Sequence, residues 1–221
     1  MFVKELWRYP VKSMAGERIP EATLTLAGFP DDRKVLVKGP RGVITSRTHH
    51  WLLGLKGTIG EDGAPHIAGH RWDSPEALSL VKEAAGPEAG LAYFEGVERF
   101  DVLPLLVATD GAIAHIGFDG RRLRPNIVIG GVEGLDERSW PGHRLRVGGA
   151  VIEVAQLRAR CVMTTYDPDS LRQDRSVLKR IVDELDGRMA LDCAVVEAGI
   201  IGEGDLVQFL ENSGPDGVGI S

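Results

Sequence analysis

The chain has 221 residues, of which 43% are hydrophobic and 26% are charged, as is ordinary for a folded globular protein. Its formal net charge of −6 argues against a general nucleic-acid-binding surface, because such surfaces are net basic. Two cysteines make no disulfide framework, and no apolar run approaches the ~20 residues that span a bilayer, so we expect a soluble cytoplasmic protein.

The first half of the chain predicts short strands separated by turn residues. Strands are expected at residues 2–7, 23–26, 33–38 and 43–46. The last two flank Gly39-Pro40-Arg41-Gly42, which is a hairpin signal. Ser74-Pro75 then predicts a helix over residues 76–85, with Ser74 as N-cap and Pro75 at the first helical position. Gly86-Pro87 is expected to end that helix.

The second half predicts longer apolar strands and one further helix. Strands are expected at residues 102–109, 126–129, 144–147, 151–156, 193–197 and 205–210. Gly148-Gly149 marks a second hairpin. Asp174 is expected to cap a helix that ends at Gly187. The apolar face of that helix would comprise Val177, Leu178, Ile181, Val182 and Leu185.

Many short strands and few helices predict a mainly β, α+β fold with a barrel-like sheet. The composition changes over residues 86–96, and we therefore expect a small N-terminal β domain over residues 1–97 and a second domain over residues 98–211. Residues 212–221 are rich in glycine and proline and predict a flexible tail.

Cys161 is the residue most indicative of chemistry. Arg158 and Arg160 precede it closely, and nearby guanidinium groups favour the thiolate, which attacks electrophiles or binds soft metals. A buried strand cysteine is the plain structural alternative. In a straight strand Arg160 and Cys161 would point to opposite faces, so a shared site requires a bend near residues 160–161.

Three separated motifs together resemble the MOSC family. They are Tyr-Pro-Val-Lys-Ser at 9–13, Arg-Pro-Asn at 124–126 and Ala-Arg-Cys-x-x-Thr-Thr-x-Asp-Pro at 159–168. Singly each has a structural explanation, such as a solvated arginine or a strand threonine, and their order along the chain makes the resemblance specific. The chain is most similar to the branch that contains the mitochondrial amidoxime-reducing component and its bacterial relatives. That resemblance implies a MOSC-type β-barrel with a small N-terminal β domain and a few short helices.

The resemblance also implies a molybdenum cofactor, with Cys161 as the catalytic residue and the ligand of the metal. The cofactor-binding residues that it implies are Lys12, Ser13, Arg33, Arg47, Arg124, Asn126, Arg160, Thr164, Thr165 and Asp167. Lysine and arginine suit the phosphate of molybdopterin, and an asparagine amide suits a pterin edge. Ala159 stands where many relatives have serine. Cys193, in an apolar stretch, is expected to be a buried structural thiol.

The function implied by the resemblance is reduction of N-hydroxylated small molecules to N–H compounds and water, with electrons from an external donor protein. No nucleic-acid or membrane partner is expected. A carrier of sulfur or cofactor, using a Cys161 persulfide, is the main alternative, and a catalytically silent binding module is another. A Cys-His-Asp nucleophile in which His115 or His143 approaches Cys161 also remains open.

Overall fold

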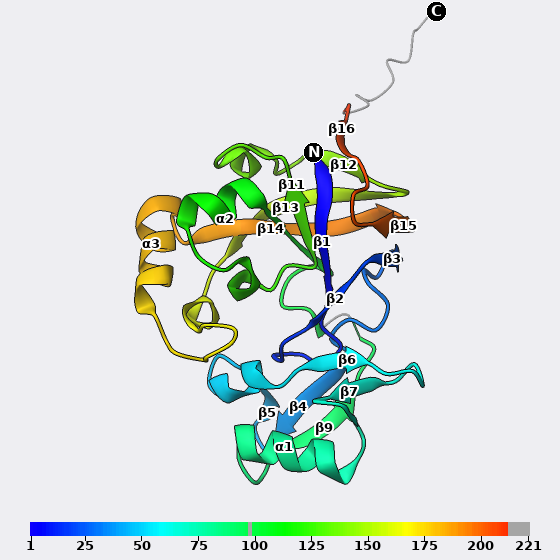
Figure 1. Ribbon diagram of the computed structural model, residues 1–221, viewed down its shortest axis with the longest axis vertical. Coiled ribbons are helices and arrows are strands. Elements are labelled where there is room, and N and C mark those ends of the chain that lie inside the picture. The colour runs from blue at the N-terminus through cyan, green and yellow to red at the C-terminus, as the bar shows by residue number, and fades with distance from the viewer. Residues whose placement is uncertain (97–98, 212–221) are drawn as a thin grey trace, which may run out of the picture.

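The computed structural model describes residues 1–96 and 99–211, which form an upper lobe around one large sheet and a smaller lower lobe (Figure 1). The predicted flexible tail, residues 212–221, lies outside the described residues. No helix within the described ranges is long and apolar enough to cross a bilayer.

Strands dominate the chain, and the predicted mainly β, α+β class is confirmed. The strands are β1 Phe2–Arg8, β2 Glu17–Ile19, β3 Glu21–Leu24, β4 Val35–Gly39, β5 Gly42–Ile44, β6 Gly57–Ile59, β7 Pro65–Ile67, β8 His70–Arg71, β9 Gly90–Tyr93, β10 Leu105–Thr109, β11 Ile127–Gly130, β12 Arg144–Val147, β13 Ala150–Ala159, β14 Arg188–Glu197, β15 Gly199–Gly202 and β16 Val207–Leu210. The α-helices are α1 Pro75–Ala85, α2 Asp110–Ile116 and α3 Arg175–Leu185. Short 3-10 helices are η1 His50–Gly54, η3 Gly120–Leu123, η4 Asp136–Ser139 and η5 Val162–Thr165.

The upper lobe contains an eight-stranded mixed sheet in the order β16-β12-β13-β14-β10-β11-β1-β2. Within the described ranges the strand ladder runs from β16 to β2 without closing into a ring. The start of β1 nevertheless bonds to the segment that leads into β16, since Val3 N donates to Asp205 O at 2.8 Å and Val207 N to Met1 O at 3.0 Å. The barrel-like expectation therefore corresponds to a sheet curled onto itself.

The N-terminal strands β1 and β2 belong to this same sheet, where β1 pairs antiparallel with β11. The first residues of the chain thus fold together with strands from its second half. The domain division at residue 97 remains a prediction.

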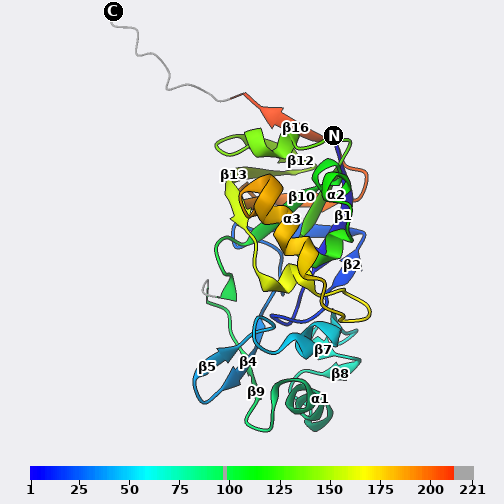
Figure 2. The same ribbon diagram turned by 90° about the vertical axis from the view of Figure 1, so that its left-hand side faces the viewer.

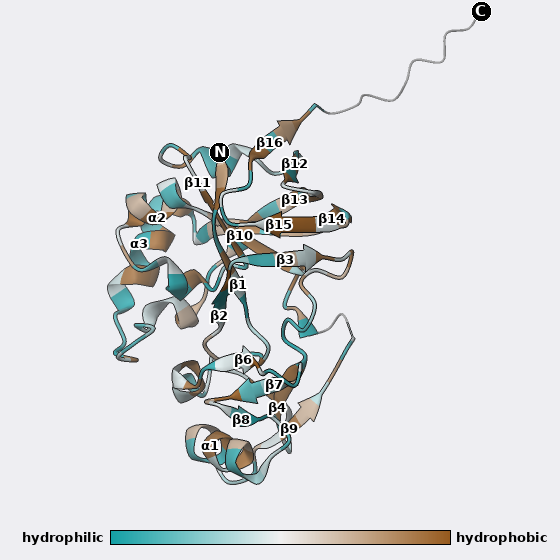
Figure 3. Ribbon diagram, turned by 45° about the vertical axis from the view of Figure 1, so that its right-hand side comes forward, coloured by the Kyte–Doolittle hydropathy of each residue, from teal (hydrophilic) through white to brown (hydrophobic). Residues whose placement is uncertain are grey.

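Helices α2 and α3 pack together on one side of the large sheet (Figure 2). The strands of that sheet are largely hydrophobic, whereas the two helices show hydrophobic and hydrophilic residues side by side (Figure 3). The apolar face predicted for α3 is confirmed for Val177, Ile181 and Leu185, which are buried. The prediction is wrong for Val182, which is 51% exposed. Consecutive helical positions lie about 100° apart, so Val182 falls outside the stripe that contains Ile181.

The lower lobe has its own apolar core beneath β4, β9 and α1. The hairpin of β4 and β5 is confirmed, with Gly39 opposite Gly42. Helix α1 begins after Ser74, whose hydroxyl accepts a hydrogen bond from Ala77 N, and Gly86 is its C-cap, as predicted. Strand β4 begins two residues later than predicted, because Arg33 has a left-handed φ of 56° that strands do not adopt.

Strand β13 ends where the site begins. Its pairing with β14 shifts register at three places, and it stops at Ala159, so the predicted bend before Cys161 is confirmed. The chain then enters η5, which contains Thr164 and Thr165, and the strand alternative for these threonines is wrong. Cys161 is partly exposed and lies outside any strand, which overturns the alternative of a buried strand cysteine.

Candidate functional site: a cationic cavity at Cys161

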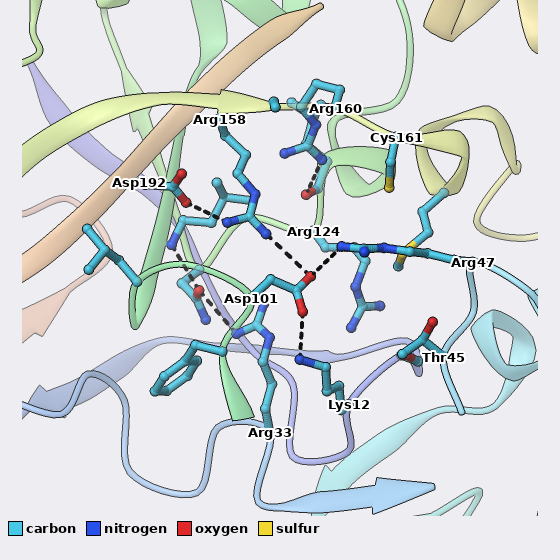
Figure 4. Close-up of a pocket in the computed structure, with 18 of the residues that line it drawn as sticks. Lys12, Arg33, Thr45, Arg47, Asp101, Arg124, Arg158, Arg160, Cys161 and Asp192 are labelled. Carbon is cyan, nitrogen blue, oxygen red and sulfur yellow. Dashed lines mark hydrogen bonds and ion pairs between the residues drawn. The ribbon is translucent and has the colours of Figure 1, made fainter. Parts of the chain in front are cut away.

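A cavity of about 120 Å³ lies where the upper and lower lobes meet, and we call it the thiol cavity because Cys161 lines it (Figure 4). Its lining includes seven basic side chains: Lys12, Arg33, Arg47, Arg122, Arg124, Arg158 and Arg160. Two acidic side chains, Asp101 and Asp192, also line it. This surplus of positive charge makes the cavity a place for an anion with several negative charges.

Asp101 is the centre of the ion pairs in the cavity (Figure 4). Its carboxylate accepts from Lys12 Nζ at 2.7 Å, from Arg47 Nη2 at 3.0 Å and from Arg158 Nη2 at 3.4 Å. Burial by itself would raise the pKa of Asp101, but the hydrogen bond from Lys12 and the surrounding positive charges outweigh it and hold this pKa below its usual range. Burial lowers the pKa of Lys12 despite that bond. Asp101 therefore neutralises much of the cationic wall from within the protein.

Tyr9 orients two of the guanidinium groups. The Arg33 guanidinium carbon lies 5.0 Å from the centre of the Tyr9 ring, and that of Arg124 lies 4.4 Å from it. Arg33 also pairs with the fully buried carboxylate of Asp32, which accepts from Tyr9 N at 2.7 Å. Arg124 Nη1 donates to the carbonyl of Met14. Burial, with the charge of Arg33 adding to it, lowers the pKa of Arg124 to about 10.

Three cavity residues have left-handed backbone conformations. The φ angles are 72° at Ser13, 56° at Arg33 and 58° at Arg124. Residues other than glycine adopt such angles at a cost of about 1 kcal/mol or more. Holding these three side chains at the cavity therefore lowers the stability of the fold. Ser13 and Arg124 belong to the motifs that resemble the MOSC family, and Arg33 is among the cofactor-binding residues that the resemblance implies.

Arg160 and Cys161 follow β13 side by side and both line the cavity. Arg160 Nη2 donates to Leu123 O at 2.8 Å, while its buried Nε has no hydrogen-bond partner among the described residues. Burial lowers the pKa of Arg160 to about 10. A buried guanidinium with an unpaired N–H is costly alone, and a bound acceptor would relieve that cost.

Three predicted site residues do not line the thiol cavity. Thr164 and Thr165 are buried, and their hydroxyls donate to Cys161 O at 2.9 Å and Val162 O at 2.6 Å. Asp167 accepts from Ser170 N at 2.9 Å and pairs with Arg122 at 3.1 Å. These contacts shape the turn after Cys161, so the motif Thr-Thr-x-Asp-Pro positions the thiol rather than lining its cavity.

Asn126 lines the cavity, yet its amide already bonds to the protein. Nδ2 donates to Trp7 O and to Asp32 Oδ2, each at 3.3 Å, and Oδ1 accepts from Leu106 N at 3.2 Å. The amide therefore ties β1 and the loop of Asp32 to the start of β11. Lys12, Ser13, Arg33, Arg47, Arg124 and Arg160 are brought together around Cys161 as the sequence predicts.

Sequence reasoning missed the acidic residues of the site. Asp101 lies in a loop outside all the motifs, and nothing in its neighbourhood signals it. Asp192 carried a usable signal, because it is the one charged residue in the apolar stretch 189–196, and a buried carboxylate needs partners. Its carboxylate accepts from Arg158 Nη1 at 2.9 Å and Gln156 Nε2 at 3.2 Å.

The histidines considered as general bases lie elsewhere. His115 contacts Glu184 at 3.3 Å, and His143 packs against Phe209 with its Nδ1 3.2 Å from Trp140 O. Among the described residues that line the thiol cavity there is no histidine. Cys193 is buried, and burial raises the pKa of its thiol, as suits a structural cysteine.

Comparison with known families gives matches over most of the chain. A family model for the MOSC domain matches residues 108–208. A second model, for the MOSC N-terminal beta barrel domain, matches residues 1–70. The chain belongs to the MOSC family.

Curated relatives of this MOSC protein include amidoxime-reducing components. Mitochondrial amidoxime-reducing component 1 of Homo sapiens is 24% identical over 76% of this chain and 67% of the relative. Its counterpart from Mus musculus is 25% identical over 78% and 68%. Mitochondrial amidoxime reducing component 2 of Homo sapiens is 31% identical, over 34% of this chain and 24% of the relative.

Solved structures with similarity to the chain include YuaD of Bacillus subtilis and YiiM of Escherichia coli. The YuaD structure has a TM-score of 0.48 and 12% identity, covering 94% of this chain and 93% of that one. The YiiM structure has a TM-score of 0.45 and 13% identity, covering 92% and 69%.

The thiol cavity of this MOSC protein fits the molybdenum cofactor that the family implies. Its surplus of guanidinium groups suits the phosphate, and a thiolate is a ligand for soft metals. The unpaired Nε atoms of Arg122 and Arg160 are buried donors that a ligand with several acceptors can satisfy.

Proposed function

We propose that this MOSC protein is a molybdenum-cofactor-dependent reductase of N-hydroxylated compounds. The observation that supports it most is the position of Cys161, a partly exposed thiol in a cavity with seven basic and two acidic side chains. The relatives named as amidoxime-reducing components give the reaction class. Cytoplasmic location and an external electron-donor protein remain predictions.

The residues of the cavity divide into two roles. Lys12, Arg47 and Arg158 would bind the phosphate, because their charges already converge on one carboxylate in the structure. Cys161, as thiolate, would be the protein ligand of the metal. When bound, the cofactor would supply the two-electron change by which N–OH and two protons become N–H and water.

The protein's own contribution is orientation and electrostatics. The hydroxyl of Thr164 donates to the carbonyl of Cys161 and thereby fixes the backbone that carries the thiol. Arg160, held through Leu123 O, places a positive charge next in sequence to the residue that carries the sulfur. These fixed charges need no rearrangement during the reaction.

The test is to purify the protein from a host that makes the cofactor, measure molybdenum per chain, and assay benzamidoxime reduction with reduced methyl viologen. We expect close to one molybdenum per chain and turnover that Cys161→Ser abolishes. Cys193→Ser is the matched control and should retain both. Bound cofactor without turnover, or a persulfide on Cys161, would contradict the reductase and support the carrier alternative.

A further inference from the structure

A second cavity lies next to the thiol cavity and shares Arg122, Arg124 and Met163 with it. Its volume is about 390 Å³, within the range of roughly 300–1,000 Å³ common for small-molecule sites. We call it the aromatic cleft, because Trp7, Tyr9 and Tyr166 line it. Two of its lining residues, Met163 and Tyr166, follow Cys161 within five residues.

The aromatic side chains of the cleft are held in place from outside it. The ring of His50 stacks on that of Tyr166, with centroids 4.6 Å apart and planes inclined by 6°. Trp7 Nε1 donates to Glu5 at 2.8 Å, and the Tyr9 hydroxyl donates to Pro125 O at 3.1 Å. Tyr9 is buried and its ring already contacts Arg33 and Arg124, so the partly exposed rings of Trp7 and Tyr166 supply the apolar surface, which favours a flat aromatic ligand.

The charges of the cleft favour an anion. Its lining contains five basic residues, Arg18, Lys56, Arg121, Arg122 and Arg124, and one acidic residue, Asp169. Arg18 pairs with Glu203, Arg121 with Asp119 and Asp169, and Arg122 with Asp167. Within the described part of the chain the exposed Lys56 has no ion pair. The cleft therefore keeps a donor for a negatively charged group.

We propose that the aromatic cleft binds planar aromatic carboxylates, with the ring against Trp7 and Tyr166 and the carboxylate toward Lys56. Resting on the proposed function, this makes the preferred substrates N-hydroxylated aromatic compounds that carry an acidic group. The shared wall of Arg122, Arg124 and Met163 places such a ligand directly beside the thiol cavity.

Binding is tested with 2-naphthoate and its neutral counterpart 2-naphthamide by titration calorimetry. We expect naphthoate to bind the wild-type protein about two- to fivefold more tightly, the effect of one partly exposed ion pair. Lys56→Gln should abolish that preference. Trp7→Ala should weaken both ligands about tenfold, as loss of an aromatic contact does.

The controls locate the binding. Lys38→Gln removes another exposed lysine and should change nothing, and Lys12→Gln should leave naphthoate binding intact because Lys12 lines the thiol cavity only. Absence of naphthoate binding, equal affinity for naphthamide in wild type, or unchanged binding in Lys56→Gln would overturn the proposal. Lys56 is exposed, so that variant stays informative if Trp7→Ala does not fold.

The link to catalysis is a separate measurement. With 4-carboxybenzamidoxime and benzamidoxime as substrates, the carboxylated one should have a lower KM, and Lys56→Gln should make the two KM values equal with kcat unchanged. Calorimetry needs neither metal nor turnover, so the binding site can stand if the reductase function fails. An equal KM for both substrates in wild type would show that the cleft does not hold the substrate.

Discussion

The carboxylate of Asp101 lies at the point where three basic side chains of the cavity converge. A phosphate or sulfate entering the cavity must displace this carboxylate from Lys12, Arg47 and Arg158. We therefore expect Asp101→Asn to bind inorganic phosphate about fivefold more tightly, since a partly exposed ion pair is worth about 1 kcal/mol at most. Calorimetric titration of both proteins checks this. A weaker affinity in the variant would mean that Asp101 organises the cations for the anion instead of competing with it.

The same carboxylate makes stability depend on pH. Because the pKa of Asp101 is lower in the folded protein than in an unfolded chain, its stabilising effect is present above the ordinary carboxylate pKa of about 4. That effect is lost as the pH falls through the lowered value. Urea denaturation should show wild type more stable than Asp101→Asn at pH 7, with the difference shrinking below about pH 4. A difference that persists undiminished at pH 3 would contradict this.

The two thiols should react very differently. Cys161 is partly exposed in its cavity, whereas Cys193 is buried and burial raises the pKa of its thiol. Iodoacetamide should label one thiol per native chain and none in Cys161→Ser, and both wild-type thiols should react only in denaturant. Peptide mass mapping identifies the labelled residue. Labelling of Cys193 in the native protein would contradict its structural role.

At this scale the resemblance to the family predicted five of the seven basic residues, Lys12, Arg33, Arg47, Arg124 and Arg160, together with Cys161, whereas Arg122 was missed and Arg158 was expected only as a charged neighbour of the thiol. The acidic partners were not predictable from motifs. Asp101 acquires its role only when its loop folds over residues from three other segments, and charge pairing over such separations leaves no local pattern. Thr164, Thr165 and Asp167 were predicted to bind the cofactor, and in the structure their hydrogen bonds shape the turn after Cys161.

At the scale of elements, helix α1 offers a direct check on capping. Ser74 accepts from Ala77 N, so Ser74→Ala should lower the free energy of unfolding by about 1 kcal/mol. Ser79→Ala, at an exposed position inside the same helix, is the matched control and should be neutral or slightly stabilising. Urea denaturation measures both. Equal effects of the two substitutions would show that the cap contributes nothing specific.

Elements with local signals were the predictable ones. Glycine pairs marked both hairpins, and serine, proline and glycine marked α1 closely. The 3-10 helix after Cys161 was missed because its threonines favour strands, and here their hydroxyls bond to the carbonyls of Cys161 and Val162. The bend before Cys161 was predictable, since a straight strand could not place Arg160 and Cys161 in one cavity, but the strand was predicted over residues 151–156 and β13 continues to Ala159.

At the scale of the whole molecule, the site depends on the meeting of two lobes. Lys12, Arg33 and Arg47 come from segments before residue 50, and Arg124, Arg158 and Arg160 come from the second half. The mainly β class followed from composition and spacing. The position of β1 inside the large sheet did not follow from the sequence, because pairing between distant strands is set by global packing.

Arg124 joins the lobes, since its guanidinium donates to Met14 O and lies over the ring of Tyr9. Arg124 also lines the thiol cavity, where the resemblance implies that it binds the cofactor. Arg124→Ala should then weaken cofactor binding by about 2–3 kcal/mol, the worth of one hydrogen bond to a charged group. The pterin content of the purified variant, measured by fluorescence after oxidation, checks this. Full pterin content in the variant would count against a role for Arg124 in binding.

The central claim is that Cys161 ligates molybdenum, and X-ray absorption at the molybdenum edge tests it most directly. Wild-type holo protein and Cys161→Ser protein would be compared for the number of sulfur atoms around the metal. We expect one sulfur fewer in the variant, with the pterin still bound through the basic residues. An identical sulfur count in the two proteins, from the cofactor's own sulfurs alone, would contradict the assignment of Cys161.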